Sequence, residues 1–142
     1  MPSVPLFVYG TLMRGHQRHD LLAGCPFLGP ATTAEPMILF DCGGYPAMVR
    51  GTGSGFVEGE VFSIPPELLS VLDDYEAVAE GEYVRATVEV RLGSGLPALI
   101  AAQAYLYARP TDGLPMVGPR WPREAERDLD RPISAPEPAN QV

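Results

Sequence analysis

The chain has 142 residues, which suits a single domain with a buried core, and its formal net charge is −8 with no lysine. The basic residues are all arginine and are scattered along the chain, so the sequence is a poor candidate for binding nucleic acid or an anionic membrane surface. No apolar run approaches the roughly 20 residues of a membrane span, and residues 1–8 lack the regions of a signal peptide, so we expect a cytoplasmic protein.

The sequence holds two cysteines, Cys25 and Cys42, and two histidines, His16 and His19. These residues form no CxxC and no other spacing typical of metal ligands, so we expect two reduced thiols and no metal site. An alternative interpretation puts the histidines near the mouth of a pocket.

Short apolar or alternating segments typical of strands recur along the chain, at residues 5–9, 27–33, 37–40, 45–49, 56–64, 82–92 and 99–107. Pro46 favours an edge or irregular position for the fourth of these segments. Residues 17–22 and 67–75 have the character of short helices, and the second follows Pro65 and Pro66, which suit a first helical turn. So many short strands, with one or two short helices, predict a closed or nearly closed barrel.

The pattern degrades from residue 109 onward, although we expect Trp121 to anchor one turn of structure on the body of the domain. Residues 131–142 are rich in proline and alanine and have no apolar period, which is typical of a disordered tail. We therefore predict one domain at residues 1–130 and a disordered C-terminal tail at residues 131–142.

The first candidate site is a turn directly after the first predicted strand, formed by Tyr9, Gly10, Thr11 and Leu12. A glycine at such a turn lets the backbone approach a ligand closely, and successive amides in a tight turn form a nest that binds a carboxylate or an oxyanion. On the local sequence alone, a plain corner between a strand and a turn is the preferred interpretation.

The second candidate is acidic. Asp73, Asp74 and Glu76 crowd the end of a predicted helix, where the helix dipole favours cations. Local conflict with a structural rule is where function is expected, and neighbouring carboxylates raise the pKa of one of their number. Taken alone, the segment is better interpreted as a solvated acidic helix end, with Tyr75 continuing the leucine stripe into the core.

Tyrosines form the third set of candidates. Tyr45 follows paired glycines, so it lies either in the lining of a pocket or packed against a tight turn. Tyr83, Tyr105 and Tyr107 lie on predicted strands, where most tyrosines pack with the hydroxyl reaching solvent.

In combination and in order, four motifs resemble the γ-glutamylcyclotransferase-like family, which includes the AIG2-like proteins and the γ-glutamylamine cyclotransferases. Residues 8–15 (VYGTLMRG) are similar to its YGTLxxG signature, and residues 57–62 (VEGEVF) to its VxGEVY strand. Residues 72–76 (LDDYE) are similar to its LDxYE segment, and residues 83–85 (YVR) to its YxR. The order and spacings agree over residues 6–107, which is far more specific than YGTL alone, and the first and third motifs are most similar to the γ-glutamylamine branch.

The resemblance implies an α+β fold, a small mixed β-barrel flanked by short helices. It further implies that the first motif's loop holds the γ-glutamyl part of the substrate through backbone amides and that Glu76 is the general acid/base. Our candidate substrate-binding residues are the residues of this loop and two tyrosines: Tyr9, Gly10, Thr11, Leu12, Tyr45 and Tyr83. Ala77 replaces a glycine that the family often has after the glutamate, and we expect a slightly different turn with activity retained.

The implied reaction is a cyclisation that releases 5-oxoproline and a free amine from a small-molecule γ-glutamyl substrate. It requires no protein nucleophile, metal, nucleotide or redox cofactor, because the substrate's own amine attacks and one carboxylate can take and return the proton. The alternative function is a non-catalytic small-molecule binding module on the same fold, and the glutamate at position 76 favours the enzyme. The leaving amine and the oligomeric state stay open at this point.

Overall fold

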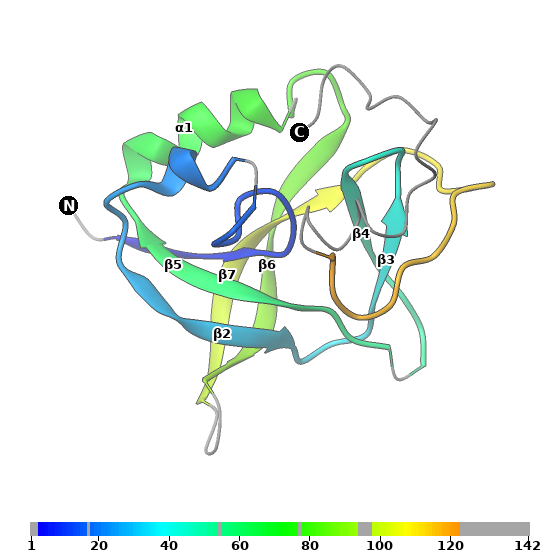
Figure 1. Ribbon diagram of the computed structural model, residues 1–142, viewed down its shortest axis with the longest axis horizontal. Helices are drawn as coiled ribbons and strands as arrows, with labels where there is room; N and C mark the ends of the chain where they lie inside the picture. The colour runs from blue at the N-terminus through cyan, green and yellow to red at the C-terminus, as the bar shows by residue number, and fades with distance from the viewer. Residues whose placement is uncertain (1–2, 17, 54, 77, 94–97, 123–142) are drawn as a thin grey trace.

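The computed structural model describes residues 3–16, 18–53, 55–76, 78–93 and 98–122. Five strands form a closed barrel in the order β1-β5-β2-β6-β7. Their bounds are β1 (Val4–Val8), β2 (Phe27–Thr33), β5 (Glu58–Ile64), β6 (Tyr83–Leu92) and β7 (Ala98–Tyr107). Figure 1 shows this barrel with α1 across its top, so the predicted α+β barrel with short flanking helices is confirmed.

The barrel is mixed because of one contact. The pairs β1–β5, β5–β2, β2–β6 and β6–β7 are antiparallel, whereas β1 and β7 pair in parallel through Leu6 and Gln103. This parallel contact brings the N-terminal strand beside the last strand of the barrel. The first and last strands of the barrel therefore meet at one seam, and β1 lies between β5 and β7.

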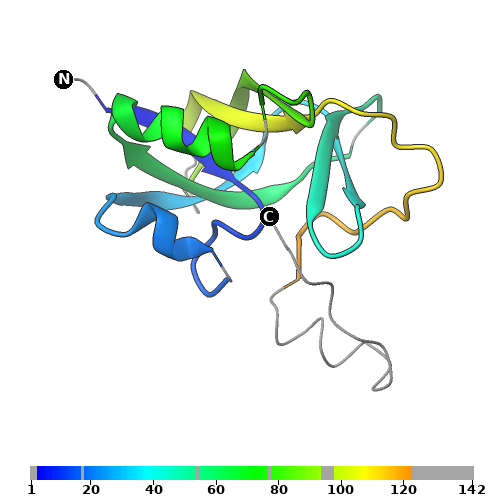
Figure 2. The same cartoon turned by 90° about the horizontal axis from the view of Figure 1, so that it is seen from above.

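A two-stranded antiparallel sheet of β3 (Met37–Asp41) and β4 (Pro46–Arg50) accompanies the barrel. In Figures 1 and 2 this sheet stands at one end of the barrel, and β4 lies near β7. Pro46 is the first residue of β4, where a missing backbone donor is tolerated, so the predicted edge character of this segment is confirmed.

The two helical elements are short. A 3₁₀ turn (η1) spans His19–Leu22, within the segment predicted as a helix, and α1 spans Pro66–Tyr75. Proline at the first helical positions fixes the start of α1, and the buried Leu69 and Leu72 pack it against the barrel. In the described part of the chain, neither helical element is long and apolar enough to cross a membrane.

The alternation in β6 does not run as the sequence suggests. Tyr83 is buried and Val84 is 48% exposed, although Val88 and Val90, on the face of Val84, lie in the core. The reason is that the covered face changes along the strand: the barrel interior covers Val88 and Val90, whereas at the start of the strand β4 covers Tyr83 on the other face. Trp121 is buried, as expected of an anchor for the segment after β7.

Three sequence predictions fall on positions outside the described residues. These are the start of the predicted helix at residue 17, the alanine at position 77, and the tail at residues 131–142.

Candidate active site

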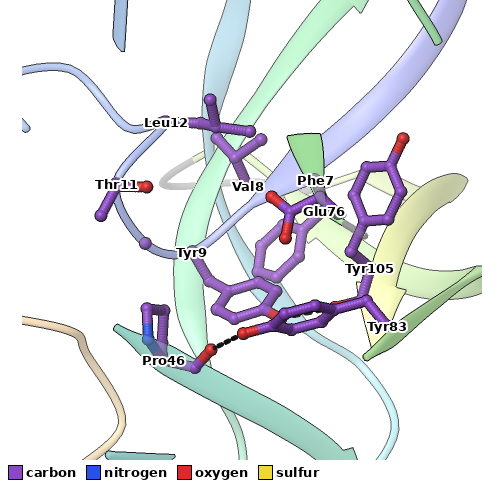
Figure 3. Close-up of a pocket in the computed structure, with 10 residues that line it drawn as sticks. Phe7, Val8, Tyr9, Thr11, Leu12, Pro46, Glu76, Tyr83 and Tyr105 are labelled. Atoms are coloured by element: carbon purple, nitrogen blue, oxygen red, sulfur yellow. Dashed lines mark hydrogen bonds between the residues drawn. The ribbon is translucent and has the colours of Figure 1, made fainter. Parts of the chain in front are cut away.

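A pocket opens where the end of β1, the start of β4, the end of α1 and the β6–β7 hairpin converge. It has about 360 Å³ of empty space, its open mouth included. The described residues that line it are Phe7, Val8, Tyr9, Gly10, Thr11, Leu12, Pro46, Glu76, Tyr83 and Tyr105. Figure 3 shows them as sticks.

The turn after β1 forms one wall of the pocket. The amide of Met13 donates to the carbonyl of Gly10 at 3.0 Å, which closes a tight turn over residues 10–13. Gly10 is required here because a Cβ atom would lie 2.4 Å from Cγ of Pro46, the first residue of β4. The missing side chain lets the β3–β4 sheet approach the turn and complete the wall.

Glu76 forms the opposite wall and directly follows α1. Its amide donates to the carbonyl of Leu72 at 2.8 Å, so its backbone ends the helix and its side chain enters the pocket. In Figure 3 the carboxylate lies between the loop that carries Thr11 and Leu12 and the ring of Tyr105. Burial, together with the negative charge of Glu82, raises the pKa of Glu76 to about 8. The group can therefore gain or lose a proton near neutral pH.

Three tyrosines fix the geometry around Glu76. The hydroxyl of Tyr9 donates to the carbonyl of Tyr105 at 2.5 Å, and the hydroxyl of Tyr83 donates to the carbonyl of Pro46 at 2.5 Å. The hydroxyl of Tyr105 donates to Asp73 at 2.6 Å. Burial and nearby negative charges raise the pKa of Tyr9 and of Tyr83, so both stay protonated donors. The expectation that the Tyr83 hydroxyl reaches solvent is wrong, because β4 covers it.

The structure brings six of the seven predicted site residues together: Tyr9, Gly10, Thr11, Leu12, Tyr83 and Glu76 all line the pocket. Tyr45 does not line it; its hydroxyl donates to Glu82 at 3.0 Å, on the neighbouring surface. Sequence reasoning missed Pro46 as a wall residue, and it treated Tyr105 only as a packing residue.

The source of the raised pKa of Glu76 also differs from the expectation. Its acidic neighbours in sequence are not the cause: Asp73 is paired with Arg85 at 2.9 Å, and Asp74 is exposed. The carboxylate that acts on Glu76 is Glu82, which comes from the turn before β6. The helix end is thus neither a solvated acidic cluster nor a shared carboxylate site.

His16 and His19 do not line this pocket. Nδ1 of His19 lies 2.9 Å from the carbonyl of Leu12, so this imidazole supports the back of the turn. Among the described residues, no group of three or more His, Cys, Asp or Glu side chains is arranged to hold a metal ion.

Comparison with known proteins gives the class of protein to which this barrel and pocket belong. The family model described as "Gamma-glutamyl cyclotransferase, AIG2-like" matches residues 6–123, which include all ten lining residues. The chain belongs to this family of γ-glutamylcyclotransferase-like proteins.

Individual relatives agree with this assignment. The chain is 34% identical over 121 residues to the γ-glutamylaminecyclotransferase of Homo sapiens, covering 75% of this chain and 78% of the relative. It is 32% identical over 112 residues to the γ-glutamylcyclotransferase family protein YtfP of Escherichia coli, covering 79% of this chain and 89% of the relative. The crystal structure of a mouse AIG2-like protein superposes with a TM-score of 0.72 at 24% identity, over 87% of this chain and 99% of that one, which shows the shared fold.

Proposed function

We propose that this protein is a γ-glutamylcyclotransferase that acts on a γ-glutamyl amine, releasing 5-oxoproline and the free amine with Glu76 as general acid/base. The observation that carries the proposal is the partly buried carboxyl of Glu76 in the pocket, with its pKa raised to about 8, opposite the turn at residues 10–13. A carboxyl in this condition is suited to proton transfer at neutral pH, whereas an ordinary exposed glutamate is fully ionised there.

The reaction is an internal aminolysis. The substrate's α-nitrogen attacks its own γ-carbonyl carbon and forms the lactam C–N bond, and the bond from that carbon to the leaving nitrogen breaks. The enzyme needs to hold the glutamyl chain curled, because orientation of an intramolecular attack contributes as much as roughly 7–11 kcal/mol. The narrow pocket between the β1 turn and the tyrosine rings is suited to such a constraint.

In this proposal Glu76 carries out the proton transfers of the reaction. The α-ammonium of the bound substrate loses a proton to the Glu76 carboxylate, which frees the lone pair for attack. Glu76 passes this proton to the leaving nitrogen, so the amine departs neutral. After the attack the ring nitrogen still carries one proton too many for the lactam, and it loses this second proton to the ionised Glu76 carboxylate. Glu76 then releases the second proton to the departing amine or to solvent and returns to its starting state. A substrate ammonium close to Glu76 also lowers the pKa of this carboxyl, which favours the ionised form in the complex.

The negative charge on the oxygen of the tetrahedral intermediate requires hydrogen-bond donors, which would lie on the wall opposite Glu76. We assign this role to backbone amides of Gly10, Thr11 and Leu12, since successive amides of a tight turn converge on an anion. Removing one oxyanion donor typically lowers the rate about 100- to 1,000-fold. The hydroxyls of Tyr9 and Tyr83 are already engaged with backbone carbonyls, so their role is to hold the walls.

The preference for an amine over an amino acid as leaving group rests on similarity to the human γ-glutamylaminecyclotransferase. Its test is a panel of γ-glutamyl amines and γ-glutamyl amino acids, with 5-oxoproline followed by mass spectrometry and Glu76→Gln run alongside. We expect 5-oxoproline from wild type and none above background from the variant. Glu80→Gln, an exposed glutamate nearby, is the matched control and should retain full activity.

If wild type forms no 5-oxoproline from any member of the panel, the proposed reaction is contradicted for those substrates. A titration with 5-oxoproline itself then distinguishes the alternative function, a non-catalytic binding module, because such a module would still bind the ligand.

A further inference from the structure

A network of side chains joins the last turn of α1 to the β6–β7 hairpin. Oδ1 of Asp73 accepts hydrogen bonds from the Tyr105 hydroxyl at 2.6 Å and from Nε of Arg85 at 2.9 Å, and its Oδ2 accepts one from Nη2 of Arg85 at 3.2 Å. Nη1 of Arg85 donates to Gln103, whose amide donates to Thr87. The two-point contact between guanidinium and carboxylate fixes orientation as well as distance.

This network holds the last turn of α1, which leads directly into the proposed acid/base. Asp73 lies in this turn, and Glu76 follows three positions later as the residue that caps the helix. The backbone of Glu76 is tied to this last turn by the hydrogen bond from its amide to the carbonyl of Leu72. The contacts that hold the last turn of α1 at Asp73 therefore also hold the position from which the side chain of Glu76 enters the pocket.

Tyr105 links this network to the pocket itself. Its ring lines the pocket beside Glu76 (Figure 3), its hydroxyl donates to Asp73, and its backbone carbonyl accepts the hydrogen bond from Tyr9. The other flank of the helix end is also held, because the Tyr75 hydroxyl lies 3.3 Å from Oγ1 of Thr11 in the turn after β1. The helix end that carries Glu76 is thus attached both to Tyr105 on β7 and to the turn after β1.

We propose that Asp73, held by Arg85 and Tyr105, is a positioning residue that sets the place of Glu76 for proton transfer. The inference rests on the proposed function of Glu76. Asp73 does not itself line the pocket, so it acts through the helix and the tyrosine.

The network persists over the working range of pH. Burial alone would raise the pKa of Asp73, but the hydrogen bonds from Arg85 and Tyr105 and the charge of Arg85 outweigh it and lower this pKa below its ordinary value. Asp73 therefore stays ionised and paired while Glu76 titrates. The role of Asp73 is one of position, and exchange of a proton with the substrate belongs to Glu76.

The test compares Asp73→Asn with Asp74→Asn, the same substitution at the adjacent and exposed aspartate. Asparagine keeps the size of the side chain but loses the charge that holds Arg85. A misplacement of 1 Å costs as much as about 100-fold in rate, and the turn that would bind the γ-glutamyl group is untouched. We expect kcat for 5-oxoproline formation to fall about 10- to 100-fold in Asp73→Asn with KM within about threefold of wild type, while Asp74→Asn matches wild type.

Each other outcome overturns the inference in a distinct way. Wild-type kcat in a folded Asp73→Asn protein with a lower Tm would show that the network is structural only. A raised KM with unchanged kcat would show that it acts on binding. A wild-type enzyme that forms no 5-oxoproline overturns the proposed function, and this inference with it.

A second variant, which keeps all charges, tests the inference in case Asp73→Asn does not fold. Tyr105→Phe retains the ring in the pocket and the Asp73–Arg85 pair and removes one hydroxyl. It should lower kcat about 3- to 10-fold at unchanged KM, by the same displacement of Glu76 on a smaller scale. NMR titration of the Glu76 carboxyl in this variant adds a readout without turnover: displacement toward water lowers its pKa from about 8, and an unchanged pKa with unchanged kcat refutes the positioning role.

Discussion

Replacing the proposed acid/base should make the protein more stable. The carboxyl of Glu76 has a pKa of about 8 in the folded protein, against an ordinary value of 4.5, because burial and the charge of Glu82 disfavour its ionised form. The folded state therefore binds this proton more tightly than the unfolded chain does. The contribution of Glu76 to stability is fully present below pH 4.5 and is lost as pH rises through about 8.

The magnitude follows from the two pKa values. At 1.36 kcal/mol per pKa unit, the ionised carboxylate costs the fold roughly 5 kcal/mol once pH exceeds 8, and roughly 3 kcal/mol at pH 7. Glutamine has no charge to bury at any pH. We expect the free energy of unfolding of Glu76→Gln, relative to wild type, to increase by about 4 kcal/mol between pH 5 and pH 9.

Urea unfolding of both proteins at a series of pH values from 5 to 9 measures this difference, with the free energy of unfolding extrapolated to water. Glu80→Gln, at an exposed position, serves as the control and should run parallel to wild type across the series. If the curves for Glu76→Gln and wild type also run parallel, Glu76 is not destabilised by ionisation in the folded state. The reasoning that assigns it the acid/base role would then be wrong.

Two further substitutions test the surroundings of Glu76. Glu82→Gln removes the negative charge that helps to raise the pKa of Glu76, so the rising limb of kcat/KM against pH should move to lower pH. The limb should not move as far as the ordinary pKa of glutamate, because burial is the larger cause of the raised pKa. A limb that stays in place contradicts its assignment to Glu76. Gly10→Ala puts a Cβ atom 2.4 Å from Cγ of Pro46, which forces the turn and β4 apart. We therefore expect a loss of about 1–3 kcal/mol in the free energy of unfolding by urea titration and a drop in kcat of at least tenfold. Full activity and stability of that variant would show that the turn can move away from β4 without consequence.

The sequence allowed most elements of the barrel to be located, since apolar alternation and turn residues are local properties. The β6–β7 hairpin is the clearest case, because a glycine-containing stretch separates an alternating segment from a second apolar one. Glu76 could be singled out as acid/base only through the resemblance of the LDDYE segment to a known motif. On its own, the helix-dipole conflict at Asp73 has a structural resolution, namely the pairing with Arg85.

The remaining parts of the site depend on contacts between distant segments. Pro46 reaches the pocket because the β3–β4 sheet stands beside Gly10, and Tyr105 reaches it because β7 lies next to β1. The influence of Glu82 on Glu76 and the position of Tyr45 likewise follow from the packing of loops, which no local pattern encodes. A tyrosine on a strand carries no sequence mark that distinguishes a pocket wall from a packed core.

The parallel contact between Leu6 and Gln103 also governs when the site can come into existence. The strand that leads into the proposed substrate turn is near the beginning of the chain, and its neighbour across the seam is near the end of the barrel. Contacts so far apart in sequence form late and slow folding, because loop closure precedes any gain from pairing. During synthesis or refolding, β1 and β7 each expose an unpaired edge until the seam closes, and such edges favour association with other chains. Closing the barrel therefore completes the pocket and removes the aggregation hazard in a single event.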